Sequence, residues 1–484
     1  MNWKELSHLS CQEIKELQNK KLSYFVQHEL PFSPFYRELF KKHNISFDEI
    51  QTTDDLQKVP FASKVDIAPT QDEPAKPRQF ILQPDEALIK KYAAKSKLLK
   101  ILWGKLTGQD VKRKLEWEYK PIHLHFTTGR TALPTPFAYP ARDVELLKES
   151  GERMLDVAQV SRDLVAINAF PYAPHLAFWL AYNALTKLGM TSVQTGGGKI
   201  MGTQKILDAT ERMKAGLLVF IPGYGYHLMR EAIKQKKDFS NLKIIISGGE
   251  RASVGLREKV KEILRQLGAK DPKFLSTYAF TEGKTAWVQC HEQSGYHLYP
   301  DFEFFEVVDK EGQRVKEGEP GELVYTSLNW RGSVVLRYRT GDMTEGIEYN
   351  PCPHCGKTVP RIKMDIQRNS EIKEFNLTKV KGELINLNQF YPVLSGIPEI
   401  EEWQVEICKK NNDPYEVDKI IIYLAPKQGV SFEELRSKIS KVVRDEIFIS
   451  TEIVEKKLPE LLQMLGMETE LKEKRIIDNR PKDK

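Results

Sequence analysis

Between residues 164 and 267 the chain alternates short apolar runs with longer segments of helical periodicity. The apolar runs are four to six residues long, as expected of buried strands. The pattern predicts strands at Leu164–Ala169, Thr191–Gln194, Leu217–Ile221 and Lys243–Ile246, and helices at Leu176–Lys187, Gln204–Lys214 and Val254–Leu267. Such alternation is typical of parallel βαβ units.

The segments on either side have different patterns. Residues 1–100 are Lys-rich with helical spacing, interrupted by prolines. After Glu303 the pattern predicts strands at Phe304–Val308, Glu322–Leu328 and Ser333–Tyr338. The last segment predicts strands at Trp403–Ile407 and Lys419–Leu424, and helices at Phe432–Arg444 and Lys457–Gln463. We predict an α/β protein: a large domain (1–366) with parallel βαβ layers and a β-rich segment, plus a small mobile α+β domain (367–484).

Composition narrows the function classes. With 484 residues, 40% of them hydrophobic, the chain can bury the cores of more than one domain. Its 73 Lys and Arg against 67 Asp and Glu give a net charge of +6. We interpret the positive charge as spread along the chain, so no nucleic-acid partner is expected. The most apolar region, Leu164–Leu188, is interrupted by prolines, so no membrane partner is expected either. The N-terminal segment lacks a secretory apolar region and five cysteines make no disulfide framework, which predicts the cytoplasm.

Three polar motifs follow one another along the chain. Thr127-Thr128-Gly129-Arg130 can wrap phosphates, and Thr281-Glu282, in Tyr278-Ala279-Phe280-Thr281-Glu282, can hold a metal ion on them. Tyr338-Arg339-Thr340-Gly341-Asp342 places at the end of a strand a carboxylate that can accept hydrogen bonds from ribose hydroxyls. Taken singly, the three are also compatible with a polar turn, a strand end with a solvated Glu, and a loop Asp. Their order favours one nucleotide site.

This ordered set resembles the adenylate-forming superfamily, and in particular the phenylacetate–coenzyme A ligase family. The resemblance implies that Tyr278 lies against adenine, Thr281 contacts the α-phosphate, Glu282 holds Mg²⁺ and Asp342 binds the ribose. It also implies nucleotide-binding roles for Ala279 and Phe280 of the second motif. The same role is expected for Gly248, Gly249 and Glu250, which follow a predicted strand, and for Arg361 and Arg368 near the hinge.

The chain departs from the family pattern, and the changes in the phosphate loop and in the hinge bear on turnover. In the phosphate loop, Arg130 stands at the position of the family's Lys and Phe126 at that of a glycine. In the hinge, Ser370 replaces the pivot carboxylate. A guanidinium still supplies a planar donor pair for phosphate oxygens. These changes leave open a family member that binds a nucleotide or acyl-AMP without turnover.

A metal site is predicted from cysteines. Cys352-Pro353-His354-Cys355 is a CxxC segment whose two thiolates can bind one ion. Because some family members carry such a segment beside an upstream Cys and His, the resemblance adds Cys290 and His297 and implies a structural Zn²⁺ site with three Cys and one His ligand. His291 or His354 in place of His297, a redox CxxC, and unliganded cysteines stay open as alternatives.

The C-terminal run Leu471-Lys472-Glu473-Lys474-Arg475 resembles the family segment that carries the catalytic Lys. Lys472 aligns with that Lys, with Lys474 or an ordinary charged tail as alternatives. The resemblance implies catalytic roles for Lys472, Glu282 and Arg130. It implies ATP-dependent formation of acyl-AMP from an aryl or hydrophobic carboxylic acid, then thioester formation, with coenzyme A as the expected co-substrate. An amine or carrier-protein acceptor, and a homodimer, are left open.

Overall fold

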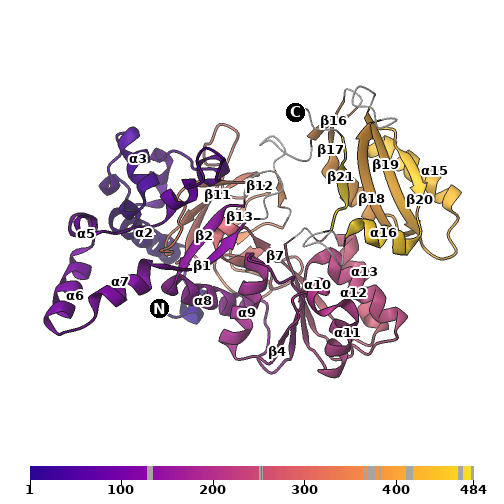
Figure 1. Cartoon of the computed structure of the whole chain (residues 1–484), viewed down its shortest axis with the longest axis horizontal. Helices are drawn as coiled ribbons and strands as arrows, with labels where there is room; N and C mark the ends of the chain where they lie inside the picture. Colours follow the sequence, from indigo (N-terminus) through magenta and orange to yellow (C-terminus); the bar gives the residue numbers. More distant parts are fainter. Residues whose placement is uncertain are drawn as a thin grey trace. The chain divides into compact units, whose positions relative to one another are not determined.

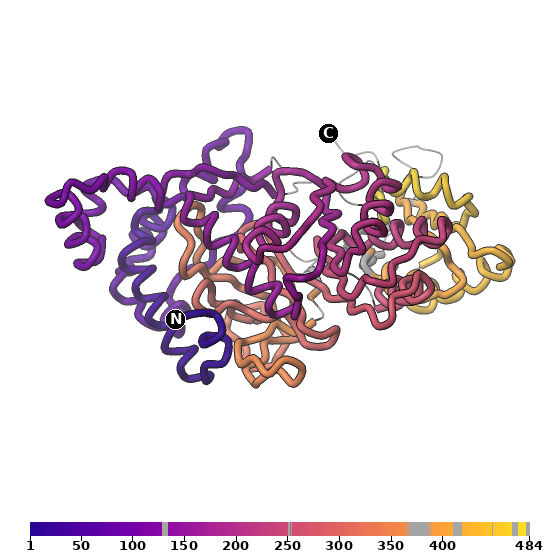
Figure 2. The backbone as a smooth tube through the Cα atoms, turned by 90° about the horizontal axis from the view of Figure 1, so that it is seen from below, coloured from indigo at the N-terminus to yellow at the C-terminus, as the bar shows by residue number. Residues whose placement is uncertain are grey.

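The computed structural model describes the chain except residues 128–133, 250–251, 253, 365, 369–376, 381–382, 410–417, 448, 467–472 and 481–484. The chain, drawn in Figures 1 and 2 with colours that follow the sequence, divides into two compact units by its internal contacts. Unit 1 consists of Met1–Ala166, Tyr172–Ser192 and Leu275–Asn369, and unit 2 of Ile167–Pro171, Val193–Phe274 and Ser370–Lys484. The division into domains 1–366 and 367–484 stays a prediction.

The βαβ pattern corresponds to a six-stranded sheet. Its strand order is β4-β3-β5-β6-β7-β8; the strands are β3 (Ala166–Asn168), β4 (Ser192–Gln194), β5 (Leu217–Phe220), β6 (Ile244–Ser247), β7 (Lys273–Ala279) and β8 (Ala286–Val288). The associated helices are α9 (Leu176–Leu188), α10 (Gly198–Met201), α11 (Thr203–Arg212), α12 (Pro222–Lys234) and α13 (Val254–Gln266). β5 and β6 are parallel, whereas β7 and β8 are antiparallel. The predicted elements are confirmed, each to within two residues at its ends.

The β-rich part of unit 1 holds a four-stranded sheet, β10-β11-β12-β15, and a small one, β13-β14-β9. Their strands are β9 (Tyr296–His297), β10 (Glu303–Val308), β11 (Gly321–Ser327), β12 (Tyr338–Thr344), β13 (Ile347–Glu348), β14 (Arg361–Ile362) and β15 (Gln367–Arg368). The predicted strand Ser333–Tyr338 is wrong, since β12 begins only at Tyr338. Arg337 has φ +48, a left-handed conformation that interrupts an extended chain.

The α-helices of unit 1 that precede β3 are α1 (Trp3–Leu6), α2 (Cys11–His28), α3 (Pro34–Lys42), α4 (Lys64–Ile67), α5 (Glu86–Tyr92), α6 (Lys95–Leu106), α7 (Val111–Tyr119) and α8 (Ala141–Val157). Ser10 caps α2, and the predicted apolar spacing buries Leu22, Phe25 and Val26 in the core of unit 1. The hairpin β1 (Pro121–Phe126) and β2 (Pro136–Pro140) follows α7. In both views α6 and α7 stand at the edge of unit 1 (Figures 1 and 2).

The C-terminal part of unit 2 is an α+β segment, as predicted. Its four-stranded sheet has the order β20-β19-β18-β21, and β16 pairs with β17. The elements are β16 (Leu377–Val380), β17 (Glu383–Asn386), α14 (Phe390–Ser395), β18 (Ile400–Lys409), β19 (Asp418–Pro426), α15 (Phe432–Ile447), β20 (Glu452–Glu455), α16 (Leu458–Leu465) and β21 (Ile476–Asp478). Within the described residues, no helix has the length and apolar character needed to cross a membrane.

Candidate functional site

Two tyrosine–carboxylate hydrogen bonds join the second and third predicted motifs in unit 1. The Tyr278 hydroxyl, at the end of β7, donates to Asp342 Oδ2 over 2.8 Å. The Tyr338 hydroxyl, at the start of β12, donates to Glu282 Oε1 over 2.9 Å. The tyrosine of each motif therefore donates a hydrogen bond to the carboxylate of the other motif. The two carboxylates that the sequence assigns to ribose and metal are thus brought into one site.

Asp342 lies within β12, whereas the sequence placed it at the end of a strand. Gly341 has φ +74, and the pairing of β11 with β12 shifts register around it. The Asp342 amide donates to Thr340 Oγ1 over 3.1 Å, which fixes the backbone at the bulge. Asp342 lies opposite Arg368 of β15, whose side chain is outside the described residues. The bulge turns the Asp342 side chain toward Tyr278.

The Thr281–Glu282 turn is held by a buried lysine that the sequence interpretation did not single out. Thr281–Gly283 forms a short 3-10 helix, and Lys284 ends it in the left-handed region with φ +59. Lys284 is fully buried, and its Nζ donates to Asp143 Oδ2 and to the Ala138 carbonyl, each over 2.8 Å. Ala138 belongs to β2, so Lys284 connects the Glu282 turn to the strand that follows the phosphate loop.

Asp143, in the first turn of α8, has the buried carboxylate that compensates Lys284. It also accepts hydrogen bonds from the backbone amides of Arg331 and Gly332, each over 2.8 Å at the shorter contact. Burial lowers the pKa of Lys284, and the Asp143 carboxylate opposes that effect. A buried charge with this many partners fixes geometry more than it adds stability. We infer that Lys284 and Asp143 are positioning residues for Glu282.

The described residues on either side of the predicted phosphate loop belong to the β1–β2 hairpin or adjoin it. Phe126 pairs with Pro136, and the Thr127 amide donates to the Thr135 carbonyl over 3.0 Å. The Thr135 amide donates back to Thr127 Oγ1 over 3.0 Å, so this hydroxyl oxygen is engaged in closing the hairpin. Thr128, Gly129 and Arg130 lie outside the described residues. Their proposed phosphate contacts stay predictions.

A histidine pair precedes this loop on β1. His123 Nε2 and His125 Nε2 lie 2.9 Å apart, so one ring donates and the other accepts. His125 is fully buried, and burial lowers its pKa to about 3, so its ring is neutral at physiological pH. His175 Nδ1 contacts the Phe126 carbonyl over 2.8 Å. These histidines support the strand that enters the loop.

Aromatic rings surround Tyr278. The Trp287 ring lies 5.6 Å from that of Tyr278 and 5.4 Å from that of Phe280, and the Tyr325 ring packs edge-on against Phe280. Ala279, between Tyr278 and Phe280, is exposed. The Trp287 indole donates to Glu303 Oε1 over 2.9 Å. The predicted adenine-binding tyrosine is thus backed by a packed aromatic layer that ends on a buried carboxyl group.

The buried Glu303 should make folding stability depend on pH. Its Oε1 accepts from Trp287 and from the Tyr299 amide, and burial raises its pKa from 4.5 to about 8. The pKa of Glu303 is higher in the native state than its unfolded value of ~4.3. The contribution of this group to folding stability is therefore complete below pH ~4.3 and is lost as the pH rises through 8. We expect Glu303→Gln to flatten the fall of Tm between these pH values, with the exposed Glu311→Gln as control. A variant Tm that falls as steeply as the wild type would contradict this.

Other predicted nucleotide-binding residues lie in unit 2. Gly248 and Gly249 follow β6, and Gly249 has φ +85, which a residue with a side chain adopts only with strain. The Ser247 hydroxyl donates to the Phe220 carbonyl over 3.2 Å and ties this end of β6 to β5. Glu250 lies outside the described residues. Gly248 is buried and Gly249 is exposed at the carboxyl end of β6, the edge of such a sheet where ligands bind, and their nucleotide-binding role stays a prediction.

The guanidinium of Arg361 is engaged by groups other than Glu282 and Asp342. It is buried on β14, opposite His297, and its guanidinium donates to Glu348 over 2.6 Å and to Asn350 over 2.9 Å. None of the hydrogen bonds found among the described residues joins Arg361 to Tyr278 or Asp342. Its role toward ribose or phosphate stays a prediction, and its observed contacts are those of a sheet-stabilising residue.

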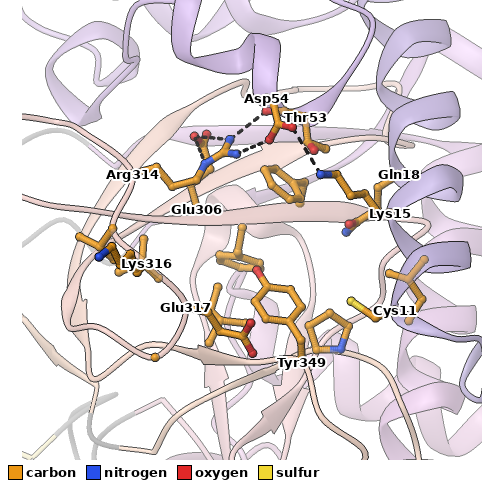
Figure 3. A pocket seen from close by; sticks show the side chains of 18 of the residues that line it. Cys11, Lys15, Gln18, Thr53, Asp54, Glu306, Arg314, Lys316, Glu317 and Tyr349 are labelled. Carbon is orange, nitrogen blue, oxygen red and sulfur yellow. Dashed lines mark hydrogen bonds and ion pairs between the residues drawn. The ribbon is translucent and has the colours of Figure 1, made fainter.

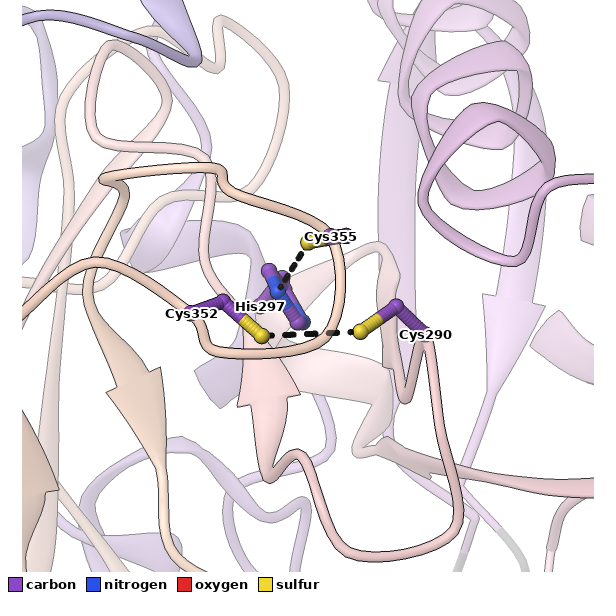
Figure 4. A group of neighbouring side chains, drawn as sticks. All are labelled: Cys290, His297, Cys352 and Cys355. Atoms are coloured by element: carbon purple, nitrogen blue, oxygen red, sulfur yellow. Dashed lines mark hydrogen bonds between the residues drawn. The ribbon is translucent and has the colours of Figure 1, made fainter.

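Cys290, His297, Cys352 and Cys355 converge as one cluster in unit 1 (Figure 4). Their ligand atoms all lie within 4.8 Å of one another. The Cys290 and Cys352 sulfurs are 3.6 Å apart, and Cys355 Sγ lies 3.3 Å from His297 Nε2. A tetrahedral zinc ion with Zn–S of about 2.3 Å and Zn–N of about 2.0 Å requires an S–S separation of about 3.8 Å and an S–N separation of about 3.5 Å. The four groups can therefore hold one metal ion with small adjustments.

A cavity of about 310 Å³ lies elsewhere in unit 1, between α2 and β10 (Figure 3). Four of its charged groups form one ion-pair network: Arg314 donates to Glu306 and Asp54, each over 2.9 Å, and Asp54 also pairs with Lys15. None of the predicted site residues lines this cavity. We interpret the ion pairs as supports that join the N-terminal helices to the β-rich part of unit 1.

The contacts between the second and third motifs agree with the predicted nucleotide site of the adenylate-forming kind. The sequence profile of the AMP-binding enzyme family matches residues 61–330, more than half of the chain, and the chain belongs to this family. The chain is 25% identical over 402 residues to a phenylacetate-coenzyme A ligase of Thermus thermophilus, covering 82% of this chain and 78% of that protein. It is 24% identical over 343 residues to a phenylacetate-coenzyme A ligase of Escherichia coli, covering 69% and 68%. The predicted resemblance to this family is confirmed.

The fold is that of a solved acyl-CoA ligase. A structure of 2-hydroxyisobutyryl-CoA ligase in complex with 2-HIB-AMP superposes with a TM-score of 0.77, covering 99% of this chain and 92% of that one. The sequence identity of 19% makes this a likeness of fold alone. The predicted fold class, with βαβ layers, a β-rich segment and a separate C-terminal α+β part, is confirmed.

Proposed function

We propose that this protein is an acid–thiol ligase that activates an aryl or hydrophobic carboxylic acid with ATP and transfers the acyl group to coenzyme A. The observation that carries the proposal is the double tyrosine–carboxylate arrangement of Glu282 and Asp342, in a chain of the AMP-binding enzyme family. The relatives named phenylacetate-coenzyme A ligase support the choice of acid and acceptor.

In the first step, a carboxylate oxygen of the acid attacks the α-phosphorus of ATP. The bond from that phosphorus to the bridging oxygen breaks, giving acyl-AMP and pyrophosphate. Asp342 accepts hydrogen bonds from the ribose hydroxyls, while Tyr278 lies against the base and orients Asp342. Glu282 would hold Mg²⁺, which neutralises charge on the departing pyrophosphate when it is bound. Thr127, Thr128, Gly129 and Arg130 are proposed to bind the phosphates.

In the second step, the thiol of coenzyme A attacks the acyl carbonyl carbon. The thioester forms, AMP leaves with the electron pair of the broken acyl–oxygen bond, and the thiol proton is released. The two steps use different groups of the substrate, so the protein must expose the acyl-AMP to a second ligand after pyrophosphate leaves. A small C-terminal domain that changes orientation would serve this purpose. The cytoplasm is the proposed location.

Pyrophosphate release tests this function. The full chain with Mg-ATP is offered phenylacetate, benzoate, medium-chain fatty acids and acetate, each with and without coenzyme A. We expect acid-dependent pyrophosphate release, and a thioester with coenzyme A, for an aryl or medium-chain acid. Acyl-AMP that accumulates and is not consumed by coenzyme A would favour an amine or carrier-protein acceptor. ATP binding without pyrophosphate release for every acid would favour a binder without turnover.

We further propose that the Cys290–His297–Cys352–Cys355 cluster binds one structural Zn²⁺ ion. Four protein ligands leave no open position for a substrate, so the ion would stabilise the fold and take no part in catalysis. The short Cys352–Cys355 turn is prearranged, because the Gly356 amide donates to the Cys352 carbonyl over 2.9 Å and Gly356 has φ +74. The ion would join the segment after β8 to the turn that precedes β14.

Removing one zinc ligand should lower stability more than chemistry. We expect about one Zn per wild-type chain, and we expect Cys352→Ser to lower Tm by at least ~5 °C, since a closed site contributes folding free energy. Below its Tm the variant should keep its kcat to within ~3-fold, because the closed site leaves no ligand position for substrate. Cys408→Ser, a thiol on β18 outside the cluster, is the matched control. A metal-free preparation with unchanged Tm would remove this proposal.

A further inference from the structure

Helix α6 exposes a continuous apolar stripe. Leu99, Leu102, Trp103 and Leu106 are 66%, 57%, 67% and 83% exposed. Their spacing of three, one and three residues places all four on one helix face. Such a face normally packs on a core, so its exposure indicates an interaction surface.

The orientation of α6 is fixed from its other face. Lys97 is mostly buried and donates to Glu118 over 3.0 Å and to Glu29 over 3.3 Å. Leu98 packs against the core of unit 1, and Gly104 lies so close to Val111 of α7 that an added Cβ would be 3.0 Å from its side chain. Rotating the helix to bury the stripe would break the ion pairs of Lys97, so the stripe stays exposed to solvent.

The surroundings of the stripe are strongly basic. Residues 90–114 contain nine Lys or Arg and one Asp, a net charge of +8 against +6 for the whole chain. The expectation that positive charge is spread along the chain is therefore wrong. With roughly 100° per residue, Lys100 and Lys105 project roughly 110° to either side of the stripe's centre. Both lysines are exposed, so cations flank the apolar face on both sides.

We propose that α6 is an interfacial helix that binds the surface of an anionic lipid bilayer. Leucines and a tryptophan on one face with lysines on its borders are the pattern of a helix lying at the headgroup boundary. Lys97 is paired internally, but seven of the other eight basic residues are also Lys, which acts as a hydrated point charge and suits a diffuse anionic surface better than paired recognition in a protein interface. A symmetric contact with a second copy would place like charges against each other.

Binding at a membrane surface does not require a membrane-spanning helix. The prolines in Leu164–Leu188 speak only against an apolar segment that crosses a bilayer. A helix of 12 residues with an apolar stripe lies in the plane of the interface and needs no such segment. Because the stripe lies outside the Glu282 and Asp342 site, its function and the ligase activity can fail independently.

Vesicle sedimentation of the full chain tests the proposal. We expect binding at low salt to vesicles of phosphatidylcholine with phosphatidylglycerol, and at least ~10-fold weaker binding to phosphatidylcholine alone. Leu102→Ser with Leu106→Ser should weaken binding at least ~10-fold, and Lys100→Glu with Lys105→Glu by a similar factor. Val65→Ser with Ile200→Ser, and Lys20→Glu with Lys41→Glu, are matched exposed controls that should bind as the wild type does.

Three outcomes would overturn the proposal. The first is no binding to the anionic vesicles at low salt. The second is binding that the leucine variants leave unchanged, which indicates general electrostatic attraction. The third is a wild-type protein that does not bind the vesicles but is a dimer by light scattering, and that the leucine substitutions convert to a monomer. This result would indicate that the stripe is a subunit interface. Circular dichroism melting of each variant checks that the fold is retained, as expected for exposed positions.

Discussion

Glu282→Gln is expected to lower acid-dependent pyrophosphate release from Mg-ATP by at least ~10²-fold, the usual loss when a charge-stabilising group is removed from a transition state. The substitution is selective. Glutamine keeps an oxygen that accepts from the Tyr338 hydroxyl, so the contact between the two motifs is retained. Only the negative charge is lost, and a hard cation binds carboxylate oxygen in preference to a neutral amide.

The reciprocal change isolates the role of the charge. Tyr338→Phe removes the hydroxyl donor and leaves the Glu282 carboxylate, so we expect a loss of ~10-fold or less, as for one hydrogen bond to a charged group. Initial rates over a range of Mg²⁺ concentrations check both variants. The Glu282 variant should need more Mg²⁺ for half-maximal rate. Equal losses in the two variants, without a change in the Mg²⁺ requirement, would argue that Glu282 only supports the turn.

The motifs could be found from the sequence because they are local. Tyr278 and Glu282 lie within one five-residue segment, and Asp342 follows a conspicuous Tyr-Arg-Thr-Gly run. The βαβ elements were predicted closely because β-branched runs and amphipathic helices carry strong periodic signals. The two tyrosine–carboxylate hydrogen bonds between the motifs could not be predicted from the sequence of either motif, because they depend on the positions of β7 and β12 relative to each other.

The supporting residues were missed for a different reason. Lys284 and Asp143 are 141 positions apart, and neither belongs to a recognisable motif. A lysine after Glu282-Gly283 is ordinarily taken as a solvated residue, and only its burial reveals the partner. Similarly, the predicted strand Ser333–Tyr338 failed at Arg337, whose left-handed backbone is held by hydrogen bonds from its guanidinium to the Gln57 and Val59 carbonyls. Both cases depend on long-range contacts that pattern analysis does not detect.

The net charge of the whole chain conceals the basic segment around α6. A net +6 over 484 residues is unremarkable, but the basic excess of residues 90–114 is more than the whole of it. A window count along the sequence would have found this segment. What the count alone could not give is the exposed apolar stripe beside it, because helix periodicity does not tell which apolar face is buried.

The C-terminal segment provides the second prediction of large effect. Lys472 lies outside the described residues, but the chain directly after it is anchored. Arg475 is buried and pairs with Glu402 and Glu473, with Glu473 Oε1 at 2.6 Å, and the Lys474 amide donates to the Leu465 carbonyl over 2.9 Å. β21 then pairs in parallel with β18. Truncating the Lys472 side chain leaves all of these contacts in place, so we expect the variant to fold.

Lys472→Ala should lower acyl-AMP formation by at least ~10²-fold, since a cation beside the reacting carboxylate and α-phosphate stabilises charge in the displacement. Thioester formation from supplied acyl-AMP and coenzyme A should stay within ~3-fold of wild type, because the second step is proposed to use another orientation of the C-terminal domain. Single-turnover assays of each half-reaction give both rates, with Lys474→Ala as the matched control. An equal loss in both half-reactions would indicate general damage to this segment, and no loss in either would transfer the role to Lys474 or Arg130.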